Sequence, residues 1–182
     1  MTPRLIDTPV LETERLTLRA PQASDFEAIV PFVTSERAQY VGGGADKDMG
    51  HAWRILAILT GHWHLRGYGS FVLVEKASGE TIGSAGPWHP GDWPETELGW
   101  TIWPAKAEGK GFAHEAVRAL RRYAYADLGW PTAVSYIDAR NTRSLALAER
   151  LGCRHDKTAP KPERDADIQV WRHPAPSEVL AA

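Results

Sequence analysis

The chain has 182 residues, a length typical of one domain that buries a substantial core. Its formal net charge of −2 excludes a strong global attraction to nucleic acid, and no run approaches the roughly 20 apolar residues of a membrane span. A single cysteine, Cys153, excludes an intrachain disulfide, and the N-terminus has no apolar run of signal-peptide length. We therefore expect one cytoplasmic domain over residues 1–182, with loose termini at 1–10 and 175–182.

The first third of the chain predicts one strand and three helical segments. Polar and apolar residues alternate over 14–20, as in a half-buried strand. Ser24 and Glu27 have the spacing of a capping box, and Pro31 is expected to end or kink the helix that follows. The expected helical segments are 24–31, 35–40 and 46–65.

Two histidines on the third of these segments, His62 and His64, raise the question of a metal site. Side chains two residues apart on a helix do not face one another. We therefore expect no metal.

The remainder of the chain first predicts strands and then alternates strands with helices. A run of strands followed by a β-α-β-α-β stretch is typical of an α+β or mixed α/β domain. The expected strands are 70–75, 80–88, 95–103, 133–138, 153–157 and 168–173, and the expected helices are about 111–128 and 142–151.

A glycine-rich turn precedes the longest amphipathic helix. Gly109 and Gly111 flank Lys110, and glycine lets backbone N–H groups approach a ligand closely. The N-terminus of the following helix adds a partial positive charge, so the segment suits a phosphate. It matches neither the P-loop, which needs Ser or Thr after Gly-Lys, nor the three-glycine dinucleotide fingerprint.

Motifs on either side of this turn narrow the interpretation. In this order they resemble the Gcn5-related N-acetyltransferase family, and more closely the branch that includes the ribosomal-protein N-terminal acetyltransferases. The residues that carry the resemblance are Leu11–Arg19, Glu97–Trp100, Gly109–Ala113 with Glu115 and Ala116, Asn141–Ser144, Leu151–Cys153 and Val170–Pro174.

The resemblance implies a strongly twisted, mostly antiparallel sheet of six to seven strands with about four helices. It also implies a V-shaped splay between the fourth and fifth strands, and acetyl transfer from acetyl-CoA to an amine in a ternary complex. Lys106 replaces the Arg or Gln usual in the family, which keeps the charge and loses the planar fork. The cofactor-binding positions implied are Trp100, Ile102, Trp103, Lys106, Ala107, Gly109, Lys110, Gly111, Phe112, Ala113, Asn141 and Ser144.

The chemistry of acetyl transfer assigns roles to a few residues. An amine must be neutral to attack, so a base is useful, and Glu97 is the best candidate, acting through a water. Glu95 lies on the same face of the predicted strand and is the alternative. No tyrosine follows Tyr136 to serve as the acid usual in the family. The resemblance implies a weak donor role for Ser144, which matches a serine that close relatives place beside the thiol.

Several alternatives stay open at this level. A catalytically silent CoA-binding sensor or scaffold has the same glycine turn, and an enzyme with a larger acyl donor has the same fold. The acceptor is either a small-molecule amine or a protein N-terminus, and Asp92, Glu95 and Glu97 near several tryptophans favour a cationic one. The sequence does not distinguish a monomer from a homodimer.

Overall fold

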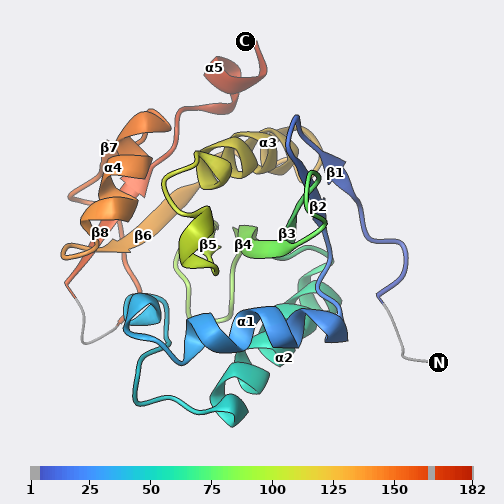
Figure 1. The fold of residues 1–182 in the computed structure, drawn as a ribbon. Helices are drawn as coiled ribbons and strands as arrows, with labels where there is room; N and C mark the ends of the chain where they lie inside the picture. The colour runs from blue at the N-terminus through green and yellow to red at the C-terminus, as the bar shows by residue number, and fades with distance from the viewer. Residues whose placement is uncertain (1–4, 164–166, 182) are drawn as a thin grey trace.

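The computed structural model describes residues 5–163 and 167–181. One eight-stranded sheet runs through the molecule in the order β1-β2-β3-β4-β5-β6-β8-β7, with helices on both faces (Figure 1). The strands are β1 (Leu11–Glu12), β2 (Leu16–Arg19), β3 (Phe71–Glu75), β4 (Thr81–Trp88), β5 (Glu97–Ile102), β6 (Val134–Asp138), β7 (Arg154–His155) and β8 (Ile168–Arg172).

Five α-helices and three 3-10 turns complete the fold over the described residues. They are η1 (Ala23–Asp25), α1 (Phe26–Val33), η2 (Glu36–Ala38), α2 (Met49–Arg66), η3 (Ala105–Ala107), α3 (Phe112–Ala126), α4 (Thr142–Arg150) and α5 (Pro176–Leu180). All strand pairs but β5–β6 are antiparallel, which confirms the predicted fold class. The strand count exceeds the prediction because Leu11 and Glu12 pair with β2.

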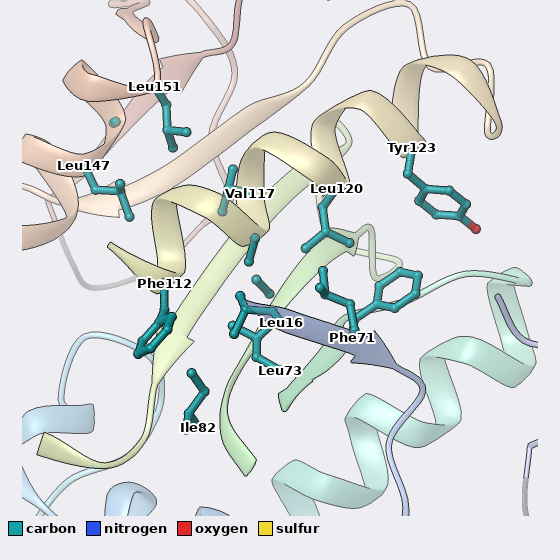
Figure 2. Close-up of a cluster of buried hydrophobic side chains, with 14 of the residues drawn as sticks. Leu16, Phe71, Leu73, Ile82, Phe112, Val117, Leu120, Tyr123, Leu147 and Leu151 are labelled. Carbon is teal, nitrogen blue, oxygen red and sulfur yellow. The ribbon is translucent and has the colours of Figure 1, made fainter. Parts of the chain in front are cut away.

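The sheet is buried on both faces because its central strands are apolar at successive positions. Phe71 and Leu73 of β3 face α3, where they pack with Leu120 in the main core (Figure 2). Val72, between them, points to the opposite face and packs with Ile29 of α1. Helix α3 therefore covers one face of the sheet, and α1 and α2 cover the other (Figure 1).

Helices α3 and α4 form where their apolar spacing predicts. Ala116, Val117, Leu120 and Ala124 of α3 are all buried, as expected for one face of an amphipathic helix. Helix α4 starts at Asn141, whose side chain accepts the N–H of Ser144 and so caps the first turn.

The start of α1 differs from the prediction. The capping box of Ser24 and Glu27 is wrong, because Asp25 instead accepts the N–H of Gln22 at 2.8 Å. Asp25 is 1% exposed and also binds Arg19, with Oδ1 and Nη2 2.7 Å apart. Pro31 lies inside α1, which continues to Val33.

The C-terminal segment is also more ordered than the sequence suggests. Residues 176–180 form α5, which lies against α3 rather than extending freely. Val179 packs against the apolar cluster that contains Tyr125 and Trp130. In the described part of the chain, no helix is both long and apolar enough to cross a membrane.

Strands β5 and β6, the predicted fourth and fifth, pair through a single residue pair, Glu97 with Val134. The N–H of Val134 donates to the carbonyl of Thr96 at 3.0 Å, and beyond this point the strands diverge (Figure 1). The splay therefore lies where the sequence predicts it.

Candidate functional site

The candidate site is a cleft of about 1020 Å3 at this splay. Its walls are the end of β5, the glycine loop with the start of α3, the first turns of α4, and the segment around η2. The predicted cofactor residues that line it are Trp100, Ile102, Ala107, Gly109, Gly111, Phe112, Ala113, Asn141 and Ser144.

Three other predicted positions point elsewhere. The side chain of Trp103 is 2% exposed and packs in the core against α1. Lys106 reaches Glu80 in the β3–β4 turn, with Nζ and Oε2 2.6 Å apart. Lys110 contributes its carbonyl, which accepts a hydrogen bond from Arg15 Nη1 at 2.9 Å. None of the three lines the cleft.

The glycine loop has the conformation that a phosphate cradle needs. Gly109 and Gly111 have φ angles of 72° and 81°, in the left-handed region that favours glycine. A Cβ at Gly109 would meet no protein atom within 4 Å, so a ligand can approach the backbone there. Arg15 anchors the loop by binding Lys110 and, through Nε, the carboxylate of Glu115 at 2.6 Å.

Arg37, from η2, joins the end of β5 to the glycine loop. Its guanidinium donates to the carbonyls of Trp103 and Ile102 at 2.6 and 3.0 Å. It also pairs with Glu108, whose second carboxylate oxygen accepts from Arg143 of α4. This carboxylate therefore connects the loop to the opposite wall of the cleft.

The charge of the cleft suits a polyanion. Four arginines and only two glutamates line it, and Glu108 is paired with two of those arginines. The arginines are Arg37, Arg140, Arg143 and Arg150, and the glutamates are Glu36 and Glu108.

Ser144 lies opposite the end of β5. Its hydroxyl oxygen accepts the indole N–H of Trp100 at 3.3 Å, and its backbone N–H donates to the Asn141 cap at 3.2 Å. The contact between Trp100 and Ser144 spans the splay from β5 to α4.

Glu97 lies at the apex of the splay and not in the lining of the cleft. Trp93 Nε1 donates to one of its carboxylate oxygens at 2.5 Å, and the N–H of Tyr136 donates to the other at 3.4 Å. Burial raises the pKa of the Tyr136 phenol to about 12, so this neighbour keeps its proton near neutral pH.

Glu95, the alternative base, has a different environment. Strand β5 begins at Glu97, so Glu95 precedes the strand and turns to Arg172, which holds it by two bonds of 2.8 and 2.9 Å. This hydrogen-bonded pairing raises the pKa of Arg172 above its usual range. Because both oxygens of the Glu95 carboxylate bind Arg172, we assign Glu95 a structural role.

Two other groups considered from the sequence, His62 and Cys153, are buried. His62 Nδ1 lies 2.8 Å from the carbonyl of Tyr68, and Nε2 accepts the N–H of His89 at 3.0 Å. In residues 5–163 and 167–181, no three His, Cys, Asp or Glu side chains cluster as metal ligands would. Cys153 is buried, and burial raises the pKa of its thiol to about 12.

Arg37 and Glu108 are among the site residues that the sequence did not indicate. Arg37 lies in a short polar turn, and Glu108 is one charged residue among several in the loop. Since 71 residues separate them, only the folded chain shows that they meet.

Comparison with known proteins decides the family. A sequence model of the acetyltransferase (GNAT) domain matches residues 15–154, which include the whole cleft from β5 to α4. The chain belongs to the GNAT acetyltransferase family. This acetyltransferase is 37% identical to a crystallised acetyltransferase from Agrobacterium tumefaciens, with a TM-score of 0.83 over 96% of this chain and 99% of that one.

Two further relatives show how widely the GNAT fold of this chain is shared. YkkB, an uncharacterized protein of Bacillus subtilis, is 27% identical over 173 residues, 90% of this chain and 91% of that protein. A ribosomal-protein-S5-alanine acetyltransferase from Vibrio fischeri superposes with a TM-score of 0.66, over 90% of this chain and 95% of that one. At 17% identity this likeness concerns the fold alone.

Proposed function

We propose that this acetyltransferase moves an acetyl group from acetyl-CoA to a primary amine by direct attack in a ternary complex. The observation that carries the proposal is the cleft at the β5–β6 splay, whose lining combines a glycine cradle with four arginines. Direct attack is favoured because the protein's one thiol, Cys153, is buried and stays protonated, so it is a poor nucleophile.

The lining of the cleft fits a CoA molecule. The N–H groups from Gly109 to Ala113, at the start of α3, suit the pyrophosphate, and the surrounding arginines suit the remaining negative charge. Trp100 and Ile102 of β5 offer the open strand edge along which an extended pantetheine arm can pair. CoA would supply the activated thioester.

The chain's own residues would then handle the protons. Glu97 would receive, through a water, the proton that the amine loses as its nitrogen bonds to the carbonyl carbon. The open edge of β5 would offer a backbone N–H to the negative charge that develops on the carbonyl oxygen. Ser144 would stand beside the departing sulfur, whose thiolate needs little acid assistance.

For the acceptor we propose a cationic amine, either a small molecule or a protein N-terminus. Asp92 precedes Trp93 in the sequence, and Glu97 accepts the Trp93 indole N–H, so two carboxylates and an aromatic ring are available to favour a positive group. The Vibrio fischeri structure of the same fold is described as acting on a ribosomal-protein alanine, which supports including N-terminal peptides among the candidates.

Calorimetry with acetyl-CoA, followed by thiol release with a panel of amines and N-terminal peptides, tests the proposal. We expect stoichiometric binding and turnover with at least one amine. Binding without turnover on any amine would favour the CoA-binding sensor or scaffold. Tighter binding and faster turnover with a longer acyl chain would favour a larger acyl donor, and no binding at all would overturn the proposal.

A further inference from the structure

The ladder between β5 and β6 stops after its first rung, although both strands continue. In a parallel ladder with even spacing, the rung after Val134 would join the N–H of Tyr136 to the carbonyl of Leu98. Instead, each of these groups is satisfied by a side chain. The Tyr136 N–H donates to Glu97 at 3.4 Å, and the Leu98 carbonyl accepts the Ser135 hydroxyl at 2.6 Å.

A buried imidazole fixes the direction of the Ser135 hydroxyl. His173 Nε2 lies 3.0 Å from Ser135 Oγ, and the two residues are 4% and 2% exposed. Since the hydroxyl donates its only proton to Leu98, it must accept from His173 Nε2–H. The second ring nitrogen, Nδ1, is then an acceptor.

The groups around Nδ1 agree with this tautomer. Arg121 Nη1 lies 3.5 Å from it and Cys153 Sγ lies 3.3 Å from it, and both can donate a hydrogen. Arg121 also donates to the carbonyl of Leu151 at 2.7 Å, which ties the network to the end of α4. Hydrogen bonds thus run in one direction, from α3 through His173 and Ser135 to the Leu98 carbonyl on β5.

We propose that Ser135 and His173 are positioning residues that hold the splay open for the cofactor. The Ser135 hydroxyl satisfies the Leu98 carbonyl while Glu97 accepts the Tyr136 N–H, so neither group of the next rung depends on the other. The edge of β5 from Trp100 onward therefore stays available. This inference rests on the proposed binding of acetyl-CoA in the cleft.

Removal of the Ser135 hydroxyl should change the pairing between β5 and β6. In Ser135→Ala the buried Leu98 carbonyl loses its donor, and an unsatisfied buried carbonyl is costly. The donor that a continued ladder would supply is the Tyr136 N–H, whose bond to Glu97 is long, at 3.4 Å. Pairing then advances by one rung and narrows the apex of the cleft.

The test compares Ser135→Ala with Ser84→Ala, a substitution on β4, the strand that pairs with the other edge of β5. We expect Ser135→Ala to raise the Kd and the KM for acetyl-CoA about tenfold, the worth of one hydrogen bond, and to leave the KM for the amine unchanged. Hydrogen exchange of the Tyr136 amide should slow. Ser135→Thr, which keeps the hydroxyl, should restore all of these values.

The control is Ser84→Ala. Ser84 is 8% exposed, and its hydroxyl meets Thr101 at 3.0 Å on the β4 side of β5. Ser84→Ala should leave the Kd for acetyl-CoA unchanged. A wild-type Kd in Ser135→Ala with unchanged Tyr136 exchange would overturn the proposal, and so would an equal loss of affinity in Ser84→Ala.

A second substitution covers failure of Ser135→Ala to fold. Ser135→Cys is nearly isosteric and replaces the hydroxyl with a weaker donor, so its Kd should lie between those of wild type and a tenfold loss. A wild-type Kd in Ser135→Cys would overturn the proposal. Absence of acetyl-CoA binding by the wild-type protein would instead refute the proposed function, so the two failures are distinguishable.

Discussion

Along one edge of β5, six consecutive residues from Glu97 to Ile102 pair with β4, whereas along the other edge only Glu97 pairs with β6. The two edges belong to the same six residues, so local strand propensity cannot explain the difference. On the open side, side chains of Glu97 and Ser135 satisfy the groups that a continued ladder would use. The candidate site lies where β5 and β6 no longer pair through their backbones.

The closed edge of β5, which pairs with β4, supports the open edge. Its pairing with β4 holds β5 in register, from Gly83 opposite Ile102 to Trp88 opposite Glu97. A rigid closed edge lets the open edge present its N–H and carbonyl groups in a fixed geometry. Substitutions at the two edges should therefore have different effects.

The largest expected effect is at Glu97, the residue of β5 that pairs with both β4 and β6. Glu97→Gln keeps the size of the side chain and one acceptor oxygen but removes the base, so kcat should fall about 100-fold while the Kd for acetyl-CoA stays nearly unchanged. The control is Glu95→Gln, which weakens the ion pair with Arg172 and should lower stability more than kcat. Steady-state kinetics and calorimetry on both variants provide the measurement, and equal losses of kcat would remove the distinction between the two glutamates.

The next effect concerns His173, behind the open edge. Burial lowers the pKa of His173 to about 3, from 6.5 for an exposed histidine. Between these values the unfolded chain binds a proton that the native protein does not, so stability falls as the pH decreases. From pH 7 to pH 5 this group should remove about 2 kcal/mol from the free energy of unfolding.

Urea denaturation at the two pH values measures this loss, and His173→Gln is the comparison. The variant lacks the titrating ring, so its stability should change less with pH than that of the wild type. An identical pH dependence in both proteins would contradict the neutral, buried imidazole.

A smaller effect is expected where the open edge leads into the glycine loop. Gly109→Ala should raise the Kd for acetyl-CoA about tenfold, because the methyl group enters space that the phosphates need. Gly79→Ala is a matched control in the β3–β4 turn, since Gly79 has a φ of 71° and a Cβ there would also meet no protein atom within 4 Å. Both variants should lose about 1 kcal/mol of stability, but only Gly109→Ala should lose affinity in calorimetry.

The smallest effect is expected at Lys106, whose side chain turns to the closed side. It pairs with Glu80 at an exposed position, so Lys106→Ala should change stability by less than about 1 kcal/mol. The Kd for acetyl-CoA should stay the same. A large loss of affinity for acetyl-CoA would instead indicate that Lys106 binds the phosphates, as the family resemblance implies.

Much of the fold could be predicted because its signals are local. The apolar spacing of α3 and the glycines before it place the helix within about two residues of its observed ends. The order of strands around it predicts a mixed sheet, and the family resemblance carried by the motifs implies the position of the splay. Both features depend on residues that are neighbours in sequence.

The remaining features depend on contacts between distant segments. Arg37 meets Glu108 only after α1 folds against the sheet, and Ser135 meets His173 across 38 residues. Glu95 and Glu97 look equivalent by alternation, yet the strand starts between them and gives them different partners. Lys106 turns away from the cleft because η3 redirects the chain there.

Hydrogen exchange of the whole protein with and without acetyl-CoA tests most directly whether the cofactor occupies the open edge. Acetyl-CoA should protect the amides of Trp100 to Ile102 and of Gly109 to Ala113, and leave those of β4 unchanged. Protection confined to other segments, or none at all, would contradict a cofactor site at the β5–β6 splay.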